Sequence, residues 1–331
     1  MTTPRALILA EEGREGVYHC VSRCVRRAYL CGDDFQSGKN FDHRKGWVHD
    51  RLIFLSKVFT IEVLGYALMS THCHSMLRTR PDLLAALSDE QVVRRWLMLY
   101  PKKNCPPGSK KFDELVRISV LDTRRVLTLR ARLGSISWLM KSLNEYIARK
   151  SNKEDGCKGR FWEGRFKCQA LCDQAAILSC AVYVDLNPIR AKIASTPEAS
   201  LYTSAYERIN SVKLNNSKSN QEEPALWLAP IQDTKNRRGF LTVSLPEYLT
   251  ILDISGRHLQ HGKKGHIPEQ LSPILERIGI KPEHWIETCQ SCSKWFGSAI
   301  GSSQSLRNLA ADLGRSWLKG VKMADRAFAQ A

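Results

Sequence analysis

Residues 61–78, with the sequence IEVLGYALMSTHCHSMLR, contain two mainly apolar runs separated by a short polar break. The first run is Ile61–Leu68, the pair Ser70–Thr71 interrupts it, and His72–Arg78 forms the second run. Short apolar runs that are bounded by turn-forming residues are typical of β-strands. This stretch therefore predicts an antiparallel hairpin, and the rest of the fold is assigned around it.

The segments on either side of the hairpin alternate between strand and helix patterns. Residues 16–27 and 165–171 predict further strands, and residues 47–59, 89–100, 135–150 and 173–186 predict helices. This order of elements predicts an α+β fold of the ferredoxin-like, split β-α-β kind, with an antiparallel sheet and helices on one face.

The polarity and the apolar periodicity of the sequence change after about residue 194. Residues 196–240 are polar and lack apolar periodicity, whereas residues 241–331 again have a helical pattern. We therefore expect three segments: a main domain over 1–195, a linker or loop over 196–240, and a mostly helical C-terminal extension over 241–331.

The composition favours a polyanionic partner. Lys and Arg number 50 against 33 Asp and Glu, which gives the 331-residue chain a formal net charge of +17. Such an excess suits nucleic acid, because each phosphate that is neutralised releases condensed counterions. A membrane partner is not expected, since no apolar stretch is long enough to span a bilayer.

The cysteine content and the N-terminal sequence predict a reducing compartment. There are 11 cysteines, an odd number, and residues 1–15 contain no apolar secretion signal. We therefore expect a cytoplasmic protein with mostly free thiols. Cys289 and Cys292 form one C-x-x-C pair, but a structural zinc site usually needs a second pair.

His72 and His74 are the first candidate site residues. Side chains two apart in a strand point to the same face, so the two imidazoles are able to grip one ion from one side. Mn²⁺ accepts imidazole readily, and Mg²⁺ would be held largely through phosphate oxygens and water. An H-x-H pair alone is a weak signal that also occurs by chance.

Tyr146 is the second candidate. It lies beside the apolar stripe of the predicted helix over 135–150 and is followed by Arg149, Lys150 and Lys153. A phenol becomes a competent nucleophile at phosphorus when a metal polarises the phosphate and cations lie nearby. The pattern of the helix alone favours the other interpretation, in which Tyr146 is a half-buried aromatic residue that only packs.

The run KGRFWEGRFK, residues 158–167, alternates cations with aromatic residues. Bases of single strands stack on aromatic rings while cations hold the phosphates, so this pattern favours nucleic-acid binding. The alternative is that Phe161 and Trp162 lie in the core of a hairpin. The candidate DNA contacts are Arg23, Arg26, Arg27, Lys158, Arg160, Trp162, Arg165 and Lys167.

Four tracts occur in an order that resembles a known family. They are YHCVSR (18–23), YALMSTHCH (66–74), GRFWEGRFK (159–167) and YVDLNPIRA (183–191). Together they resemble the single-tyrosine HUH transposases, and more closely the REP-associated tyrosine transposases of bacteria. The resemblance spans residues 16–195 and leaves the C-terminal part of the chain uncovered.

This resemblance implies a DNA-nicking and strand-transfer enzyme that acts on single-stranded or hairpin repeat DNA. His72 and His74 would be ligands of Mg²⁺ or Mn²⁺, and Tyr146 would form a 5′-phosphotyrosine intermediate. Asn152 is the candidate third ligand, and Arg190 is a further candidate DNA contact. The resemblance leaves monomer and homodimer open. The alternatives are an inactive hairpin-DNA-binding protein on the same scaffold and an RNA-binding regulator.

Overall fold

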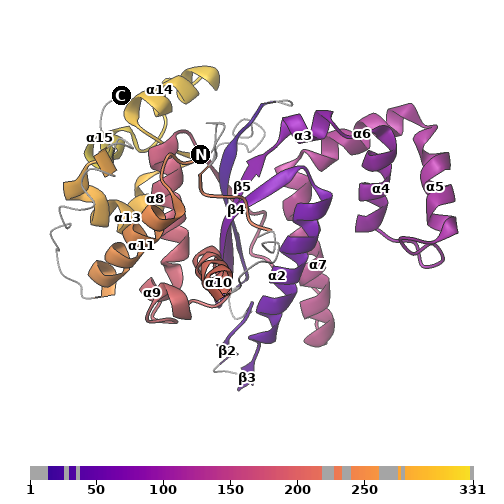
Figure 1. The fold of residues 1–331 in the computed structure, drawn as a ribbon, viewed down its shortest axis with the longest axis horizontal. Helices are drawn as coiled ribbons and strands as arrows, with labels where there is room; N and C mark the ends of the chain where they lie inside the picture. Colours follow the sequence, from indigo (N-terminus) through magenta and orange to yellow (C-terminus); the bar gives the residue numbers. More distant parts are fainter. Residues whose placement is uncertain are drawn as a thin grey trace.

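The computed structural model describes residues 14–25, 30–34, 38–217, 227–232, 240–260, 275–276 and 280–328. A five-stranded sheet in the order β4-β5-β1-β6-β7 lies at its centre (Figure 1). The strands are β1 (Val17–Arg23), β4 (Ile61–Leu68), β5 (His72–Thr79), β6 (Lys167–Leu171) and β7 (Ala299–Ile300). Neighbours are antiparallel except for β6 and β7, which are parallel. The predicted hairpin of residues 61–78 is confirmed as β4 and β5.

The register of β1 against β5 decides which side chains share a face of the sheet. Val21 lies opposite His74, and Arg23 lies opposite His72. Because side chains alternate along a strand, His19 projects from the same face as these four residues. Three histidines that are far apart in sequence are therefore brought to one face.

The opposite face of the sheet is covered by α2 (His43–Val58) and α7 (Ile136–Glu154), which pack against each other (Figure 1). Ser22 points to this side, because it lies between Val21 and Arg23 in the strand. The side-chain amide of Asn144 in α7 donates a hydrogen bond to the Ser22 hydroxyl at 2.8 Å. The helix that carries Tyr146 thus lies across the sheet from the histidines.

A second layer of helices covers the histidine face. Helix α8 (Gln174–Asp185) is buried along almost its whole length, and α11 (Leu245–Gln260) and α13 (Trp285–Trp295) pack against it (Figure 1). The α+β fold with a mostly antiparallel sheet and a helical C-terminal region is as predicted. The helices lie on both faces rather than on one. On the histidine face, α8 is apolar almost all round, and it is covered by the sheet on one side and by α11 and α13 on the other.

The helices between β5 and α7 form a projection at one side of the molecule (Figure 1). They are α3 (Pro81–Ala85), α4 (Asp89–Leu99), α5 (Lys110–Val120) and α6 (Thr123–Leu133). A capping box starts α4: the Ser88 hydroxyl accepts a hydrogen bond from the backbone N–H of Gln91, whose side chain accepts one from the backbone N–H of Ser88. Helices α5 and α6 were not expected from the sequence.

The part of the predicted linker that the structure describes contains a helix, α10 (Ser204–Ser217), which packs against β4. The polar sequence of this segment gave no sign of a buried contact. Ser204 is nevertheless buried, and its hydroxyl accepts a hydrogen bond from the backbone N–H of Tyr66 at 3.1 Å. The three-segment division itself stays a prediction. In the described part of the chain, no helix has the length and apolar character needed to cross a bilayer.

The remaining elements are short or lie near the C-terminal end of the chain. They are β2 (Asp33–Asp34), β3 (Lys39–Asn40), α9 (Asn187–Arg190), α14 (Ser303–Asp312) and α15 (Val321–Ala327), with short 3-10 turns at Pro197–Ala199 and Pro282–His284. Strands β2 and β3 form a separate two-stranded ribbon.

Asp185, at the end of α8, joins three helices through its buried carboxylate. It accepts hydrogen bonds from the Ser204 hydroxyl at 2.5 Å, the Ala205 N–H at 3.1 Å and the Tyr248 hydroxyl at 2.6 Å.

We expect Asp185→Ala to lower the free energy of unfolding by about 3 kcal/mol, because three buried donors lose their acceptor. Urea unfolding measures this change. Asp312→Ala, at an exposed carboxylate, serves as control and should change stability by less than about 0.5 kcal/mol. An equally small effect of Asp185→Ala would contradict the prediction.

Candidate functional site

Three histidines form a cluster on one face of the sheet. The ring centres of His72 and His74 are 4.9 Å apart, and those of His19 and His74 are 5.1 Å apart with parallel ring planes. The prediction that His72 and His74 point to the same side is confirmed. His19, on β1, is an additional member of the cluster that we did not predict as a site residue.

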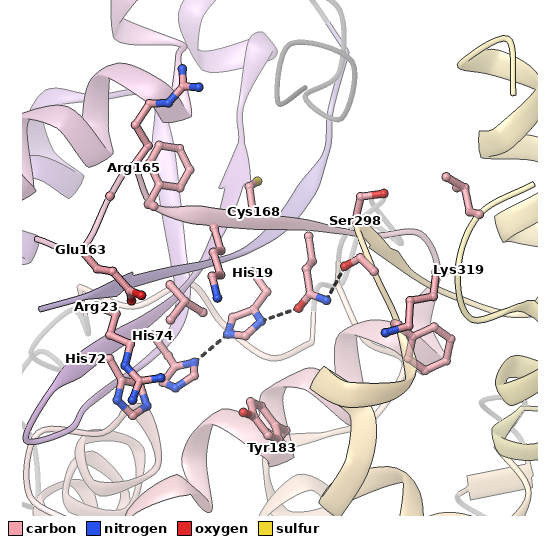
Figure 2. A pocket seen from close by; sticks show the side chains of 18 of the residues that line it. His19, Arg23, His72, His74, Glu163, Arg165, Cys168, Tyr183, Ser298 and Lys319 are labelled. Atoms are coloured by element: carbon pink, nitrogen blue, oxygen red, sulfur yellow. Dashed lines mark hydrogen bonds between the residues drawn. The ribbon is translucent and has the colours of Figure 1, made fainter. Parts of the chain in front are cut away.

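A chain of hydrogen bonds fixes the protonation of two of these rings (Figure 2). The Gln169 amide donates to the Gly297 carbonyl oxygen at 2.6 Å, so its own oxygen faces His19 Nδ1 at 3.2 Å and can only accept. His19 Nδ1 therefore carries the proton, and its Nε2 accepts from His74 Nδ1 at 2.8 Å. In a neutral His74 the remaining nitrogen, Nε2, then has a free lone pair, and it is buried with no hydrogen-bond partner among the described residues.

All three imidazoles are held in the neutral form. Burial lowers the pKa of His19 to about 4. Burial, followed by the positive charge of Arg23, lowers the pKa of His72 to about 4. The pKa of His74 lies well below its usual range, mainly because of burial. Neutral imidazole is the form that binds a metal ion.

The two imidazoles of β5 are suited to hold a metal ion between them and the substrate. His74 offers its unpartnered Nε2, and the Nδ1 of His72 lies 3.1 Å from the Thr71 hydroxyl, which leaves the other ring nitrogen of His72 for a ligand. Among the described residues, no group of three or more His, Cys, Asp and Glu side chains is arranged to bind a metal. The remaining coordination positions would therefore fall to water and substrate oxygens.

Asn152, the predicted third ligand, does not join the histidines. It lies on α7, and its side-chain amide donates to the Gly159 carbonyl oxygen at 3.0 Å. Asn152 therefore stabilises the loop that follows its helix. The expectation came from sequence spacing, which does not reveal which face of the sheet a helix covers.

Tyr146, the predicted nucleophile, also lies away from the histidines within the chain. It is 38% exposed on α7, and its ring packs 4.7 Å from the Arg51 guanidinium and 5.7 Å from the Lys150 ammonium. Because α7 covers the opposite face of the sheet, the structure does not bring Tyr146 to His72 and His74 in one chain.

A different tyrosine, Tyr183 on α8, lies beside the cluster. Its ring meets those of His74 and His19 edge-on, with ring centres 5.7 and 6.0 Å apart. The Arg190 guanidinium lies 5.0 Å from the ring centre of Tyr183. Figure 2 shows the hydroxyl end of Tyr183 directed toward the side where His72 and His74 lie. Sequence reasoning did not single out Tyr183 as a site residue, although it opens the tract 183–191.

A basic pocket with a volume of about 1530 Å³ contains these groups. This exceeds the size of most small-molecule sites and leaves room for a polymer. Its lining combines the histidine face of the sheet, Tyr183, residues 163–169 and two C-terminal segments, 296–298 and 314–319. The cations that line it are Arg23, Arg165, Lys167, Arg315 and Lys319.

Only some of the predicted DNA contacts lie in the basic pocket. Arg23, Arg165 and Lys167 line the pocket, whereas Lys158 and Arg160 are exposed on the preceding loop. Arg26 and Arg27 lie outside the described residues.

Trp162 belongs to the core rather than to an exposed stacking surface. It is 9% exposed, its ring packs edge-on against Phe161, and its indole N–H donates to the Asn144 carbonyl oxygen at 2.8 Å. The structure therefore supports the part of the alternative interpretation that places both aromatic residues in the core, but Trp162 bridges to Cys24 after β1 rather than belonging to a hairpin within the motif. A buried indole that is engaged in this way has no face left for a base.

No family model and no curated protein matches the chain. Among solved structures, the chain is similar to one of a REP-associated tyrosine transposase bound to a REP hairpin, with a TM-score of 0.36 and 10% sequence identity, over 61% of this chain and 82% of that chain. Values of this size do not establish a shared family.

Proposed function

We propose that the chain nicks and rejoins single-stranded or hairpin DNA, with Tyr183 as the nucleophile and His72 and His74 as ligands of Mg²⁺ or Mn²⁺. One observation supports this most: a phenol and two neutral imidazoles line the same basic pocket, and the Nε2 of one of these imidazoles, His74, has no hydrogen-bond partner among the described residues. The ordered motifs of the sequence agree with this proposal. Tyr183 takes the role that the sequence had suggested for Tyr146.

The proposed reaction is an exchange of phosphodiester bonds. The Tyr183 oxygen attacks the phosphorus of the scissile phosphate and gives its phenolic proton to water, while the bond from phosphorus to the 3′-oxygen breaks and that oxygen takes up a proton from water. The products are a 5′-phosphotyrosine and a free 3′-hydroxyl. Attack of a 3′-hydroxyl on the phosphotyrosine reverses the exchange and joins strands without an external energy source.

The chain's own residues would position the substrate for this attack. Arg23, Arg165 and Lys167 offer positive charge to the phosphates on either side of the scissile bond. The Arg190 guanidinium lies over the Tyr183 ring and would add positive charge near the phosphate that Tyr183 attacks. The divalent cation would supply polarisation of the phosphate.

A covalent-adduct assay tests the proposed function. The full chain is incubated with a labelled single-stranded DNA hairpin and Mn²⁺, and the products are separated on a denaturing gel. We expect a labelled band that survives SDS and disappears when EDTA is present, together with a strand that carries a free 3′-hydroxyl. Tight binding without an adduct, under Mg²⁺ and Mn²⁺ alike, would contradict the catalytic proposal.

A catalytically inactive hairpin-DNA-binding protein is the second candidate. The observation that favours it is the lack, among the described His, Cys, Asp and Glu side chains, of a group of three that could hold a metal. Binding of the same hairpin with equal affinity in EDTA and in Mn²⁺, with no cleavage, would support it. Tighter binding of an RNA hairpin of the same sequence would instead favour an RNA-binding regulator.

Metal binding should resist mild acid. Protons compete with a metal only when the pH approaches the pKa of the ligand imidazole, and the pKa of His72 is about 4. We therefore expect Mn²⁺ affinity to stay constant from about pH 8 to about pH 5 and to fall only below that range. Titration of the chain with Mn²⁺ at several pH values measures this dependence. A loss of affinity centred near the ordinary histidine pKa of about 6.5 would contradict the prediction.

A further inference from the structure

The loop Gly314–Gly320 connects α14 to α15 in the C-terminal region and forms part of the wall of the basic pocket that contains the histidines. Lys319 lies on the other side of this pocket from His72 (Figure 2). The C-terminal region also contributes β7, beside β6, and the Gly297 carbonyl oxygen that orients Gln169. This region therefore takes part in the site rather than only extending the chain.

The conformation of the loop is fixed by its two ends and by one buried side chain. Gly314 and Gly320 have φ angles of 62° and 118°, which favour glycine. A Cβ atom at position 320 would lie 2.4 Å from the Phe296 ring, so the backbone there is closely packed. Leu318 is 4% exposed and anchors the loop in the core. Trp317 is thus presented by a defined backbone.

Trp317 differs from the other tryptophans of the chain in its exposure to solvent. All eight tryptophans lie within the described residues, and Trp317 alone is exposed, at 70%. It also lines the pocket, where Arg315 and Lys319 are its neighbours in sequence. An indole face open to solvent, next to cations, is the combination that binds a nucleobase by stacking and its phosphate by charge.

We propose that Trp317 stacks on an unpaired base of the single-stranded DNA that occupies the pocket, while Lys319 contacts the adjoining phosphate. The Lys319 ammonium donates to the Lys294 carbonyl oxygen at 3.1 Å and retains two further N–H donors for a phosphate oxygen. The inference rests on the proposed function for the identity of the substrate. It assigns the C-terminal region to holding the strand beside the reacting phosphate.

Binding measured without metal tests this inference. Fluorescence anisotropy with a labelled single-stranded oligonucleotide, in EDTA, compares the full chain with Trp317→Ala, Trp317→Phe and the control Tyr100→Ala, an exposed aromatic residue outside the pocket. We expect Trp317→Ala to weaken binding by about 5- to 100-fold, and Trp317→Phe and Tyr100→Ala to weaken it by less than about threefold. Thermal unfolding checks that each variant is folded.

An oligonucleotide that lacks its bases separates stacking from charge. The wild-type chain and Trp317→Ala should bind this abasic strand equally, because no ring remains to stack. Equal binding of the normal strand by Trp317→Ala and Tyr100→Ala would overturn the inference, as would an effect of Trp317→Ala that persists with the abasic strand. An effect seen with RNA but not with DNA would overturn it too.

The outcome is independent of catalysis. A failure of the adduct assay, combined with the expected loss of DNA binding in Trp317→Ala, would reject the nicking activity and keep the stacking role. An intact adduct assay, combined with unchanged DNA binding in Trp317→Ala, would keep the nicking activity and reject the stacking role.

Discussion

Tyr183→Phe is expected to lower the rate of formation of the covalent protein–DNA adduct by at least about 1000-fold, because the variant has no hydroxyl to attack phosphorus. Tyr146→Phe is expected to leave this rate within about twofold, since Tyr146 packs against Arg51 and Lys150 on the helix layer across the sheet. The two variants differ from the wild-type chain by one oxygen atom each, so they are matched in size and shape. Single-turnover assays with labelled hairpin DNA and Mn²⁺ measure both rates.

The control for this pair is DNA binding in EDTA, which both variants should retain. Loss of binding in Tyr183→Phe would mean that the hydroxyl holds the strand rather than attacking it. The opposite result, an adduct with Tyr183→Phe and none with Tyr146→Phe, would contradict the assignment of Tyr183. It would imply that a second copy of the chain delivers Tyr146 to the histidines of the first.

The sheet could be predicted from the sequence because its main strands are long enough to show a pattern. Residues 61–78 combine two strand-like runs with a polar break, and β1 and β6 each fall within a predicted strand. Strand β7 has two residues, Ala299–Ile300, which is too short for any periodicity to appear. Its place beside β6 depends on the packing of the C-terminal region against α8, which a local pattern does not contain.

The proposed nucleophile, Tyr183, could not be predicted in this way. Helix α7 has an amphipathic pattern with cations near Tyr146, which is what an exposed catalytic helix would show. Helix α8 is apolar almost all round, so its pattern does not distinguish Tyr183 from a core residue. What separates the two tyrosines is the face of the sheet that each helix covers, and that depends on how the chain passes around the sheet edges.

His19 was missed for a related reason. Within β1 it shares a face with Val17 and Val21, and a single histidine in such a strand usually only packs. The register of β1 against β5 sets Val21 opposite His74. His19 lies two residues before Val21 on the same face, and it is therefore close enough to form a hydrogen bond with His74. A shift of one residue in this register would turn His19 to the other face.

His74→Ala is expected to weaken Mn²⁺ binding by more than about 100-fold, because it removes the imidazole whose Nε2 is held open by the hydrogen bonds from Gly297 through Gln169 and His19. Gln169→Leu keeps the ligand and removes only the acceptor that sets the His19 tautomer. We therefore expect an intermediate loss of about 10- to 100-fold for Gln169→Leu.

The loss of Mn²⁺ affinity should be larger for His74→Ala than for Gln169→Leu, and only substitutions in the pocket should cause such a loss. His72→Ala, at a less buried position, repeats the ligand test in case His74→Ala unfolds the chain. His284→Ala removes a histidine from the C-terminal region outside the pocket, and it should leave Mn²⁺ binding unchanged. Equal Mn²⁺ affinity in His74→Ala, His72→Ala and His284→Ala, measured by electron paramagnetic resonance, would remove the metal from the proposed reaction. A loss in Gln169→Leu as large as that in His74→Ala would instead mean that Gln169 itself binds the ion, because orientation alone does not account for the full affinity of a ligand.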